Sequence, residues 1–515
     1  MYRFCTTHPL ILFCCAVLLF VSGVIYYLDI ELLGFQGAEV YGHAWTHTWR
    51  FEDIPASFMG TQKTIGTEHF PIIDFIPALF SHFFHLFWNW STSYNAMVIA
   101  FILLGIIGMY QLAESEKADG LSASIILFAS PIFWGSINSG LTEDFAIGLV
   151  GLILAFRNKN PWLLGLLLGV LPYCGLVLAF MGGVLLFALW LLDYANISKD
   201  WILMKFKTIL TAFLMTIPLF FLHQDRLLHK GHRDGQHVIQ ENPFWMLNPW
   251  KHNDVASLFY YGSPNFEYEI IRLHPSSIGL IGLFLIWKSG CKTFSVLFLF
   301  CTFLSFGPEF YWMGQSTGIP NPFTWLLNIV PGYDLLNHQG RWMLMSLISF
   351  SVLAAKGIQN IKYGRYLLLA ILIEWWCFGP MGFVIKGTAN IESSILSKLP
   401  ESNRIIRLPM TGPNISFQKP LWEQHIHQQA MWLNPNHPGL HRLMKLSEQS
   451  MWLEELGIHS TIPNDFCIPD NIKGILVAQP YISMVAEKLN QPLLEDDNYA
   501  FWSIGEDYKC EVLEP

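Results

Sequence analysis

The sequence is poor in charge. Of its 515 residues only 13% are Asp, Glu, Lys or Arg, whereas 52% are hydrophobic. Soluble globular proteins carry about 25% charged residues, and disordered chains contain few apolar residues. The composition therefore excludes a water-soluble enzyme and an intrinsically disordered chain. The formal net charge of −9 also argues against a nucleic-acid-binding protein, because such a protein needs a basic face.

Cysteine is scarce as well, and its spacing matches no metal or redox motif. There are nine cysteines and no Cys-x-x-Cys pair, so neither a thiolate zinc site nor a disulfide scaffold is expected. Most of them lie in or beside apolar runs, where cysteine behaves as a small buried hydrophobic residue. Cys467 and Cys510 differ, because they lie in a polar C-terminal region. An oxidising compartment would allow them to pair, and the sequence leaves that pairing open.

Long apolar segments recur over the first 383 residues and predict a polytopic membrane protein. They cover residues 9–28, 93–112, 120–138, 141–156, 161–192, 203–222, 276–288, 293–307, 341–356 and 366–383. The first segment is too long for the apolar region of a signal peptide, and no small-residue cleavage site precedes Asp29. We therefore expect a retained anchor with its N-terminus inside.

One apolar segment, residues 161–192, has two interpretations. Pro172 lies near its middle, and proline ends or kinks a helix. Two short helices in a hairpin would give about eleven spans, whereas one kinked helix would invert everything that follows. With the hairpin, the Lys- and Arg-rich turns fall inside, and the first outside loop (29–92) carries only Arg50 and Lys63. This asymmetry is what the positive-inside rule requires, and it favours the hairpin.

The predicted fold class is an α-helical polytopic membrane protein with a small α/β domain. A transmembrane domain is expected over residues 1–383, with outside loops at 29–92, 223–275 and 308–340. An extracytoplasmic domain is expected over residues 384–515, because that region has ordinary charge density and strand-like runs at 404–408, 474–478 and 500–504. We expect the protein in the cytoplasmic (inner) membrane, with the C-terminal domain outside. No internal repeat is apparent, which disfavours transporters built from duplicated halves.

The first outside loop holds the most informative polar pattern. If residues 37–49 form a helix, Glu39, His43 and His47 recur every four residues and share one face. A carboxylate beside two imidazoles is suited to general base catalysis or to binding a divalent metal ion. A solvated polar face of an interfacial helix is the alternative. Further along the loop, Glu68, His69 and Asp74 precede an aromatic segment, Phe75 to Trp90, that predicts a second interfacial helix. These three residues either line a site or face water.

Three more acids lie at or inside apolar segments. Glu143 and Asp144 follow the outer end of one predicted span, where carboxylates are costly unless they are paired or functional. A tight turn with Thr142 as a helix N-cap is the structural alternative. Glu374 lies deeper, inside the last predicted span, and we expect it to pair with a basic residue on a neighbouring helix.

One arginine stands at the predicted outer membrane surface. Arg341 follows His338 in the segment that leads into the span at 341–356. A guanidinium at this depth binds a lipid phosphate with two hydrogen bonds, or else extends to the interface without a specific partner.

Taken in order, these features resemble the type C (GT-C) superfamily of polytopic membrane glycosyltransferases, and within it bacterial multi-pass members with a C-terminal extracytoplasmic domain. The strings that carry the resemblance are Gly37–His43, Ile73–Leu79, Ser93–Asn95, Ser130–Pro131, Gly140–Glu143, Pro331–Tyr333, Gly340–Met343, Leu399–Pro400 and Arg407–Pro409. The resemblance covers most of the chain in layout, although each string is short and degenerate. The superfamily's catalytic acid is usually an aspartate in the first loop, where this sequence has Glu39.

The resemblance implies transfer of a sugar from a polyprenyl-phosphate donor on the outer face of the membrane. The expected catalytic residues are Glu39, Asp74 and Glu143. The expected substrate-binding residues are His43, His47, Glu68, His69, Asp144, His338 and Arg341. The expected partners are the lipid-linked sugar donor and membrane lipids, and a divalent metal ion is the one cofactor that the pattern suggests. Two other functions remain open: a transporter or flippase of lipids or solutes, and a non-enzymatic membrane assembly factor.

Overall fold

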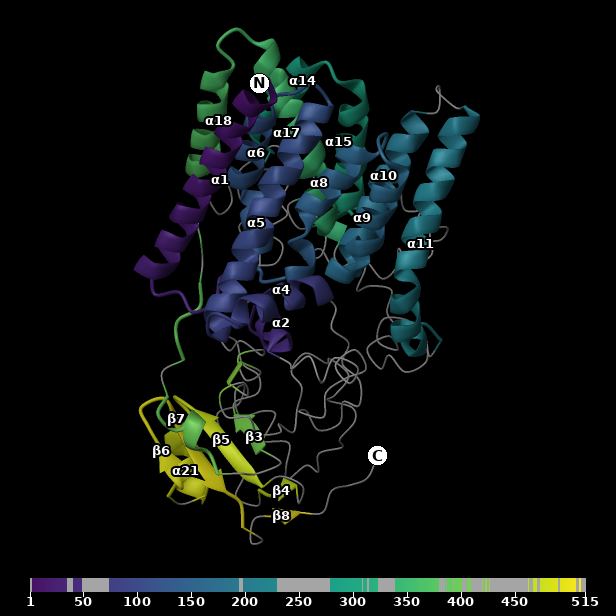
Figure 1. The fold of residues 1–515 in the computed structure, drawn as a ribbon. Helices are drawn as coiled ribbons and strands as arrows, with labels where there is room; N and C mark the ends of the chain where they lie inside the picture. Colours follow the sequence, from purple (N-terminus) through teal and green to yellow (C-terminus); the bar gives the residue numbers. More distant parts are fainter. Residues whose placement is uncertain are drawn as a thin grey trace. The chain divides into compact units, whose positions relative to one another are not determined.

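The computed structural model contains two compact units, and each is described by itself. The described residues are 2–34, 40–48, 74–193, 198–228, 278–307, 309–312, 315–322, 339–378, 385, 387–391, 393–400, 405–408, 419, 422–423, 426, 462, 466–469, 473–489, 491–505 and 509–510. The first unit holds the apolar helices, and the second holds helix α2 together with the chain after residue 387 (Figure 1). The predicted division at residues 383 and 384 stays a prediction.

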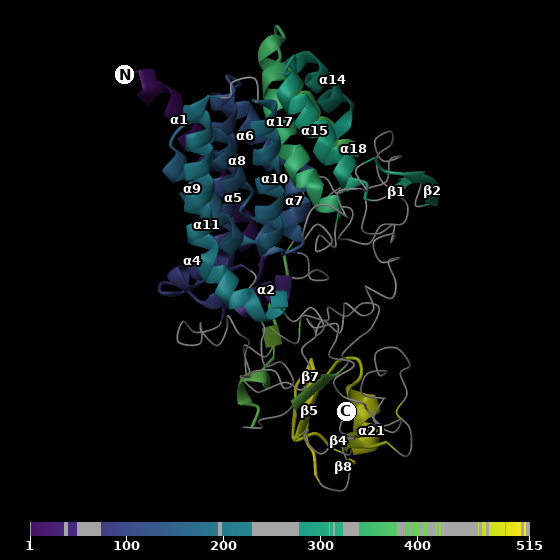
Figure 2. The same ribbon diagram turned by 90° about the vertical axis from the view of Figure 1, so that its right-hand side faces the viewer.

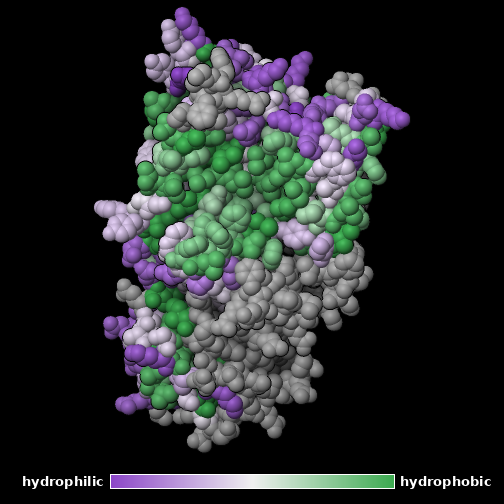
Figure 3. Space-filling model, in the orientation of Figure 1, coloured by the Kyte–Doolittle hydropathy of each residue, from purple (hydrophilic) through white to green (hydrophobic). Residues whose placement is uncertain are grey.

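The first unit is a bundle of apolar helices. They are α1 (Tyr2–Tyr27), α4 (Phe75–His85), α5 (Trp90–Ser115), α6 (Gly120–Ala129), α7 (Pro131–Asn138), α8 (Ile147–Phe156), α9 (Pro161–Cys174), α10 (Leu176–Leu192), α11 (Lys199–Leu228), α14 (Gly279–Ser289), α15 (Lys292–Ser305), α17 (Trp342–Asn360) and α18 (Arg365–Phe378). Among the described residues, four helices are long and apolar enough to cross a membrane, or five if the bent pair α6–α7 counts as one span. The chain is thus a mostly helical membrane protein, as predicted. Figure 3 shows apolar residues covering the visible sides of these helices.

Small residues let the central helices approach one another closely. A Cβ atom on Gly108 of α5 would overlap the backbone of Gly148 on α8, and one on Gly148 would overlap the backbone of Leu104. Glycine at such crossings permits the van der Waals contact that holds membrane helices together. Gly165 and Gly169 of α9 allow the same approach to Thr211 and Met215 of α11. In Figure 2, α9 and α11 lie side by side.

Polar and basic residues meet at one end of the bundle, here called the basic end. Arg157, after α8, forms an ion pair with Glu116, after α5, at 2.6 Å (Nη1 to Oε1). Lys205 of α11 donates to the carbonyl oxygen of Arg157 at 2.9 Å, and Lys356 of α17 donates to that of Glu116 at 3.1 Å. These contacts bring together the ends of six helices, all of which the sequence predicts on the inner side of the membrane. The helices are α5, α8, α9, α10, α11 and α17.

The segment 161–192 is a hairpin of two helices. The chain passes from α9 to α10 at Gly175, three residues after Pro172. Its two ends meet again at the basic end, where Nε of Arg157 lies 3.9 Å from Oδ2 of Asp193 and Asn158 donates to the same carboxylate at 3.5 Å. A single kinked helix would separate these ends by the thickness of the bundle. The predicted hairpin is confirmed.

At the opposite end of the bundle the chain forms short irregular elements. The predicted interfacial helix over residues 75–90 is shorter than expected: α4 ends at His85, and Trp90 begins α5 while its ring stacks on His85 with centroids 3.7 Å apart. The 3₁₀ turn η2 (Thr142–Asp144) precedes α8, and the 3₁₀ turn η9 (Gln339–Arg341) precedes α17. A hairpin of β1 (Glu309–Trp312) and β2 (Gln315–Pro320) follows α15, an element that the sequence did not predict.

The segment that leads toward the first outside loop is anchored at this same end. Asn95 of α5 accepts a hydrogen bond from the amide of Leu33 at 2.7 Å and donates to the carbonyl oxygen of Glu31 at 2.9 Å. Leu33 also pairs with Gly387 in an isolated antiparallel bridge. Two of the three points at which the chain leaves the first unit, after residues 34 and 387, therefore lie next to each other.

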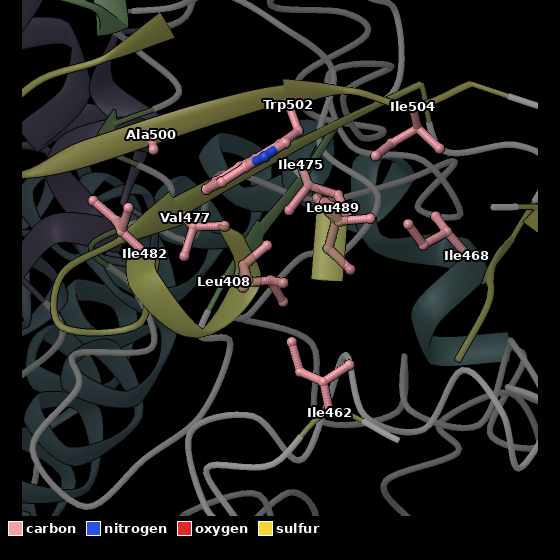
Figure 4. Packing of buried hydrophobic residues seen from close by; sticks show 12 residues of the cluster. Leu408, Ile462, Ile468, Ile475, Val477, Ile482, Leu489, Ala500, Trp502 and Ile504 are labelled. Carbon is pink, nitrogen blue, oxygen red and sulfur yellow. The ribbon is translucent and has the colours of Figure 1, made fainter. Parts of the chain in front are cut away.

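The second unit contains the expected α/β elements. Strands β3 (Ile405–Leu408), β5 (Gly474–Ala478), β7 (Tyr499–Ser503) and β6 (Leu494–Glu495) form one mixed sheet in the order β3-β5-β7-β6, with β3 and β5 parallel. Helix α21 (Ile482–Leu489) places Val485 and Leu489 in a core with Ile475, Val477 and Trp502 (Figure 4). The three strand-like runs recognised in the sequence are the three longest strands of this sheet.

Cys467 is disulfide-bonded. Strand β4 (Ile468–Pro469) follows it directly and pairs with β8 (Lys509–Cys510), so that Pro469 lies opposite Cys510. The pairing of Cys467 with Cys510, which the sequence leaves open, stays a prediction.

Candidate functional site

Four of the predicted site residues converge at the end of the bundle opposite the basic end. Asp74 stands immediately before α4 and is buried, with 1% of its surface exposed. Its Oδ2 atom accepts a hydrogen bond from the hydroxyl of Thr142, 68 residues further along the chain. The two residues that follow Thr142 are the acids Glu143 and Asp144. The hydroxyl of Thr142 thus ties the first-loop acid to the second acidic motif.

Arg341 lies against both acids of that motif. Its Nη1 atom donates to Oε1 of Glu143 at 2.5 Å, and its Nε atom lies 3.8 Å from Oδ2 of Asp144. All three side chains are buried, so their charges interact through a medium of lower dielectric constant than water. Three carboxylates and one guanidinium, contributed by segments far apart in the sequence, form what we call the Asp74–Arg341 cluster.

The local structure explains how the acids are directed inward. Thr142, Glu143 and Asp144 form a tight 3₁₀ turn, which continues into α8. Gly175, between α9 and α10, lies directly against this turn, and a Cβ atom there would overlap the carbonyl oxygen of Glu143. The α9–α10 hairpin therefore supports η2 from one side, and only glycine allows it to come so close.

The structural alternative for this turn, in which Thr142 is a helix N-cap, is not observed. Leu141 occupies the N-cap position of η2, and no side-chain capping bond forms there. The hydroxyl of Thr142 is directed to Asp74 instead. Thr142 and Gly175 are thus residues of the site that sequence reasoning missed, because neither belongs to a residue type that is diagnostic of catalysis.

The remaining predicted site residues are not part of the described cluster. Glu39, Glu68, His69 and His338 lie outside the described residues. His43 and His47 lie on α2 (Val40–His47), four residues apart as expected. His47 is buried and His43 is half-buried. Helix α2 belongs to the second compact unit. Their proposed roles stay predictions.

Glu374 binds backbone amides of another helix, and its expected pairing with a basic residue stays a prediction. It lies on α18 and accepts hydrogen bonds from the backbone amides of Leu280 at 2.7 Å and Ile281 at 3.0 Å. These amides are at the first turn of α14, where N–H groups lack partners within the helix. A carboxylate there also interacts favourably with the helix dipole. Gly279 has φ of 73° and leaves no room for a Cβ atom beside the Glu374 carboxylate. Glu374 therefore joins α18 to α14 and has a structural role.

Within the described ranges, no group of three or more His, Cys, Asp or Glu side chains is arranged to hold a metal ion. Glu39, the carboxylate of the metal site predicted with His43 and His47, is not among those residues, so the predicted divalent metal site stays a prediction.

Comparisons with known proteins give a distant structural likeness. No family model matches this chain, and no curated protein matches it. The crystal structure of ArnT from Cupriavidus metallidurans bound to undecaprenyl phosphate superposes with a TM-score of 0.47 at 12% identity, covering 98% of this chain and 99% of that chain. The apo structure of the same protein superposes with a TM-score of 0.39 at 13% identity, covering 96% of this chain and 98% of that chain. ArnT is a glycosyltransferase of the GT-C superfamily, which the sequence resembles. A likeness at these TM-scores assigns neither an activity nor a site to this chain.

Proposed function

We propose that this chain is a membrane glycosyltransferase that transfers a sugar from a polyprenyl-phosphate donor to an extracytoplasmic acceptor. The observation that carries the proposal is the Asp74–Arg341 cluster, in which one buried guanidinium is held among carboxylates at the end of an apolar helix bundle. Such a cluster is costly to bury and is a feature of functional sites. It combines the two kinds of group that the reaction requires.

The reaction sets clear demands on the protein. An acceptor hydroxyl attacks the anomeric carbon of the sugar, and a new C–O bond forms as the bond from that carbon to the phosphate oxygen breaks. The phosphate leaves with the bonding electrons, and a carboxylate takes the proton of the acceptor hydroxyl. A cation beside the leaving phosphate stabilises the negative charge that develops on it.

The proposed roles follow the chemistry of each residue. Glu39, in the first loop, is the base that takes the proton. Arg341 binds the phosphate of the donor, since a guanidinium matches phosphate oxygens with a rigid set of N–H groups. Glu143 and Asp144 hold Arg341 in place, and Asp74 or Glu143 orients the acceptor hydroxyl. The polyprenyl tail lies against the apolar faces of the bundle.

The charge distribution also supports a direction for the protein in the membrane. The basic end carries Arg157, Lys205 and Lys356, which the positive-inside rule places on the cytoplasmic side. About 15 Å of helix, the ten residues of α8 at 1.5 Å each, separates Arg157 from η2. We propose that the Asp74–Arg341 cluster and the C-terminal domain face the extracytoplasmic side of the inner membrane.

The test of this function is a transfer assay in membrane vesicles that contain the full chain. Undecaprenyl-phosphate-linked hexoses and pentoses are the probes, and mass spectrometry measures the release of undecaprenyl phosphate. We expect release above that of vesicles without the protein, and a fall of about 10²-fold or more in Glu39→Gln, because glutamine cannot take a proton. Asp200→Asn, which changes an exposed acid at the start of α11, is the matched control and should retain full activity.

Two results would contradict the proposal. Failure of the unaltered chain to release undecaprenyl phosphate from any probe argues against the transfer reaction. Full activity of Glu39→Gln leaves the reaction in place but removes Glu39 as the base.

A further inference from the structure

The carboxylate of Asp74 is used in an unusual way. Aspartate at a helix N-cap ordinarily accepts hydrogen bonds from the amides of the first turn. Asp74 occupies the N-cap position of α4, but its side chain makes no capping hydrogen bond. Its Oδ2 atom accepts a hydrogen bond from the hydroxyl of Thr142 on η2 instead. The carboxylate thus makes a tertiary hydrogen bond in place of the local capping hydrogen bond. Such a departure from the local rule is typical of residues at functional sites.

Both partners of this hydrogen bond are withdrawn from water. The exposed fraction is 1% for Asp74 and 0% for Thr142. A buried carboxylate without donors becomes protonated, because the charged form is desolvated, whereas a donor to the carboxylate favours the charged form. The hydroxyl of Thr142 is such a donor, and its place at the start of η2 fixes the direction from which it donates.

We propose that Thr142 is a positioning residue, which keeps Asp74 ionised and fixes the orientation of its carboxylate. This inference rests on the proposed function, in which an ionised Asp74 orients the acceptor hydroxyl. Thr142 also precedes the two acids that contact Arg341. One turn therefore sets the position of the acceptor-orienting carboxylate relative to the phosphate-binding guanidinium.

Other charged and titratable groups act on Asp74 from the elements around it. Tyr94 of α5 and Cys174 of α9 interact with it electrostatically. Glu143 and Asp144 lie on η2, and Arg341 lies on η9. The ordinary pKa values of tyrosine and cysteine are about 10 and 8.5, so neither residue titrates in the acidic range. All these groups are shared by the natural chain and by variants at position 142, so a difference between variants reports on the hydroxyl.

Two substitutions separate the hydroxyl from the shape of the side chain. Thr142→Val keeps the branched shape and removes the donor, whereas Thr142→Ser keeps the donor. Only Thr142→Val loses the hydrogen bond to the Asp74 carboxylate. The loss of a hydrogen bond to a charged group corresponds to a shift of about one unit in the pH at which that carboxylate is half protonated. Thr142→Ala removes the donor with a smaller side chain and serves if the valine variant does not fold.

The first measurement does not depend on catalysis. A hydrophobic carbodiimide reacts with protonated buried carboxyl groups, and peptide mass spectrometry of the full chain in detergent locates the label. We expect half-maximal labelling of Asp74 to move up by about one pH unit in Thr142→Val and to stay unchanged in Thr142→Ser. Equal labelling of Asp74 in all three proteins over the whole pH range would overturn the inference, whether or not the chain transfers sugar.

The second measurement is the pH dependence of transfer in the vesicle assay. We expect the acidic limb of the profile to move to higher pH in Thr142→Val, with a higher KM for the acceptor, and we expect Thr142→Ser to restore the natural profile. If the natural chain is active and the pH profile of Thr142→Val is unchanged, the proposed role of Thr142 is contradicted. The proposed function is not affected by that outcome. A natural chain without activity contradicts the proposed function, and the labelling result still decides what Thr142 does.

Discussion

Two buried arginines, one in each unit, are held by carboxylates in different ways. In the second unit, Arg407 forms a two-pronged pair with Glu423, from Nε to Oε2 at 2.8 Å and from Nη2 to Oε1 at 2.9 Å. The hydroxyl of Tyr499 donates to the same carboxylate at 2.7 Å. In the first unit, the guanidinium of Arg341 contacts two different carboxylates. It lies 2.5 Å from that of Glu143 and 3.8 Å from that of Asp144.

The difference separates a structural ion pair from a candidate site. Burial alone would raise the pKa of Glu423, but the charge of Arg407 and the hydrogen bonds from Arg407 and Tyr499 outweigh it and lower that pKa. A pair matched in this way stabilises one arrangement of the chain. Arg341, by contrast, lies beside more carboxylates than its charge can neutralise, in a cluster to which Thr142 also joins Asp74. Burial of an arginine does not by itself indicate function, so the proposal for Arg341 rests on its arrangement among several acids.

The largest expected effect is on the matched pair. Glu423→Gln leaves the guanidinium of Arg407 buried without a countercharge, which costs about 3–5 kcal/mol in proteins. We expect the second unit to unfold at a markedly lower temperature, measured by limited proteolysis of the full chain during heating. Glu495→Gln, which changes an exposed acid in β6, is the control. Equal resistance of the two variants would show that the Arg407–Glu423 pair contributes little to stability.

The next effect concerns Arg341. Arg341→Lys keeps the charge but removes the planar set of donors, so we expect transfer to fall about 10²-fold while the unfolding temperature changes little. Arg157→Lys, at the basic end, is the matched control and should keep its activity. Loss of stability in Arg341→Lys comparable to that of Glu423→Gln would remove the distinction between the two arginines.

The smallest effect is a pH dependence of stability in the second unit. Partial burial acts to raise the pKa of Asp496, but hydrogen bonds from Asn498, Ser393 and Tyr499 outweigh it and lower that pKa. A carboxyl group whose pKa is lowered by folding stabilises the protein above its unfolded pKa of about 3.9, and the contribution is lost as the pH falls. We expect Asp496→Asn to weaken the acid dependence of unfolding below about pH 4. An unchanged acid dependence in circular dichroism melts would show that Asp496 is not involved.

The sequence predicted the arrangement of elements well for a physical reason. Hydropathy and proline act locally, so apolar runs predicted the helices, and Pro172 predicted a break that the structure places three residues later, at Gly175. The runs at 474–478 and 500–504 became neighbouring strands, because alternating and apolar patterns of that length suit a buried sheet. The β1–β2 hairpin was missed, since residues 309–320 contain glycine and polar residues without a clear alternation.

Partners of polar groups were predicted less well. For Glu374 the sequence predicted a cation and did not predict the first amides of α14, which it binds. A helix terminus is not a residue type, so no pattern in the sequence marks it as a partner for an acid. The same limit applies to Thr142, because capping its own turn was the only role that the sequence offered for its hydroxyl.

By itself, the sequence determined that this protein is a helical membrane protein with basic residues gathered at one set of helix ends, because composition and the order of apolar and charged residues fix both. Only the tertiary structure decided which acids share a site. Asp74 meets Thr142 across 68 residues, and Arg341 meets Glu143 across 198. Those encounters depend on glycine crossings such as Gly108 with Gly148 and on the support of η2 by Gly175, and such packing is a property of the whole bundle.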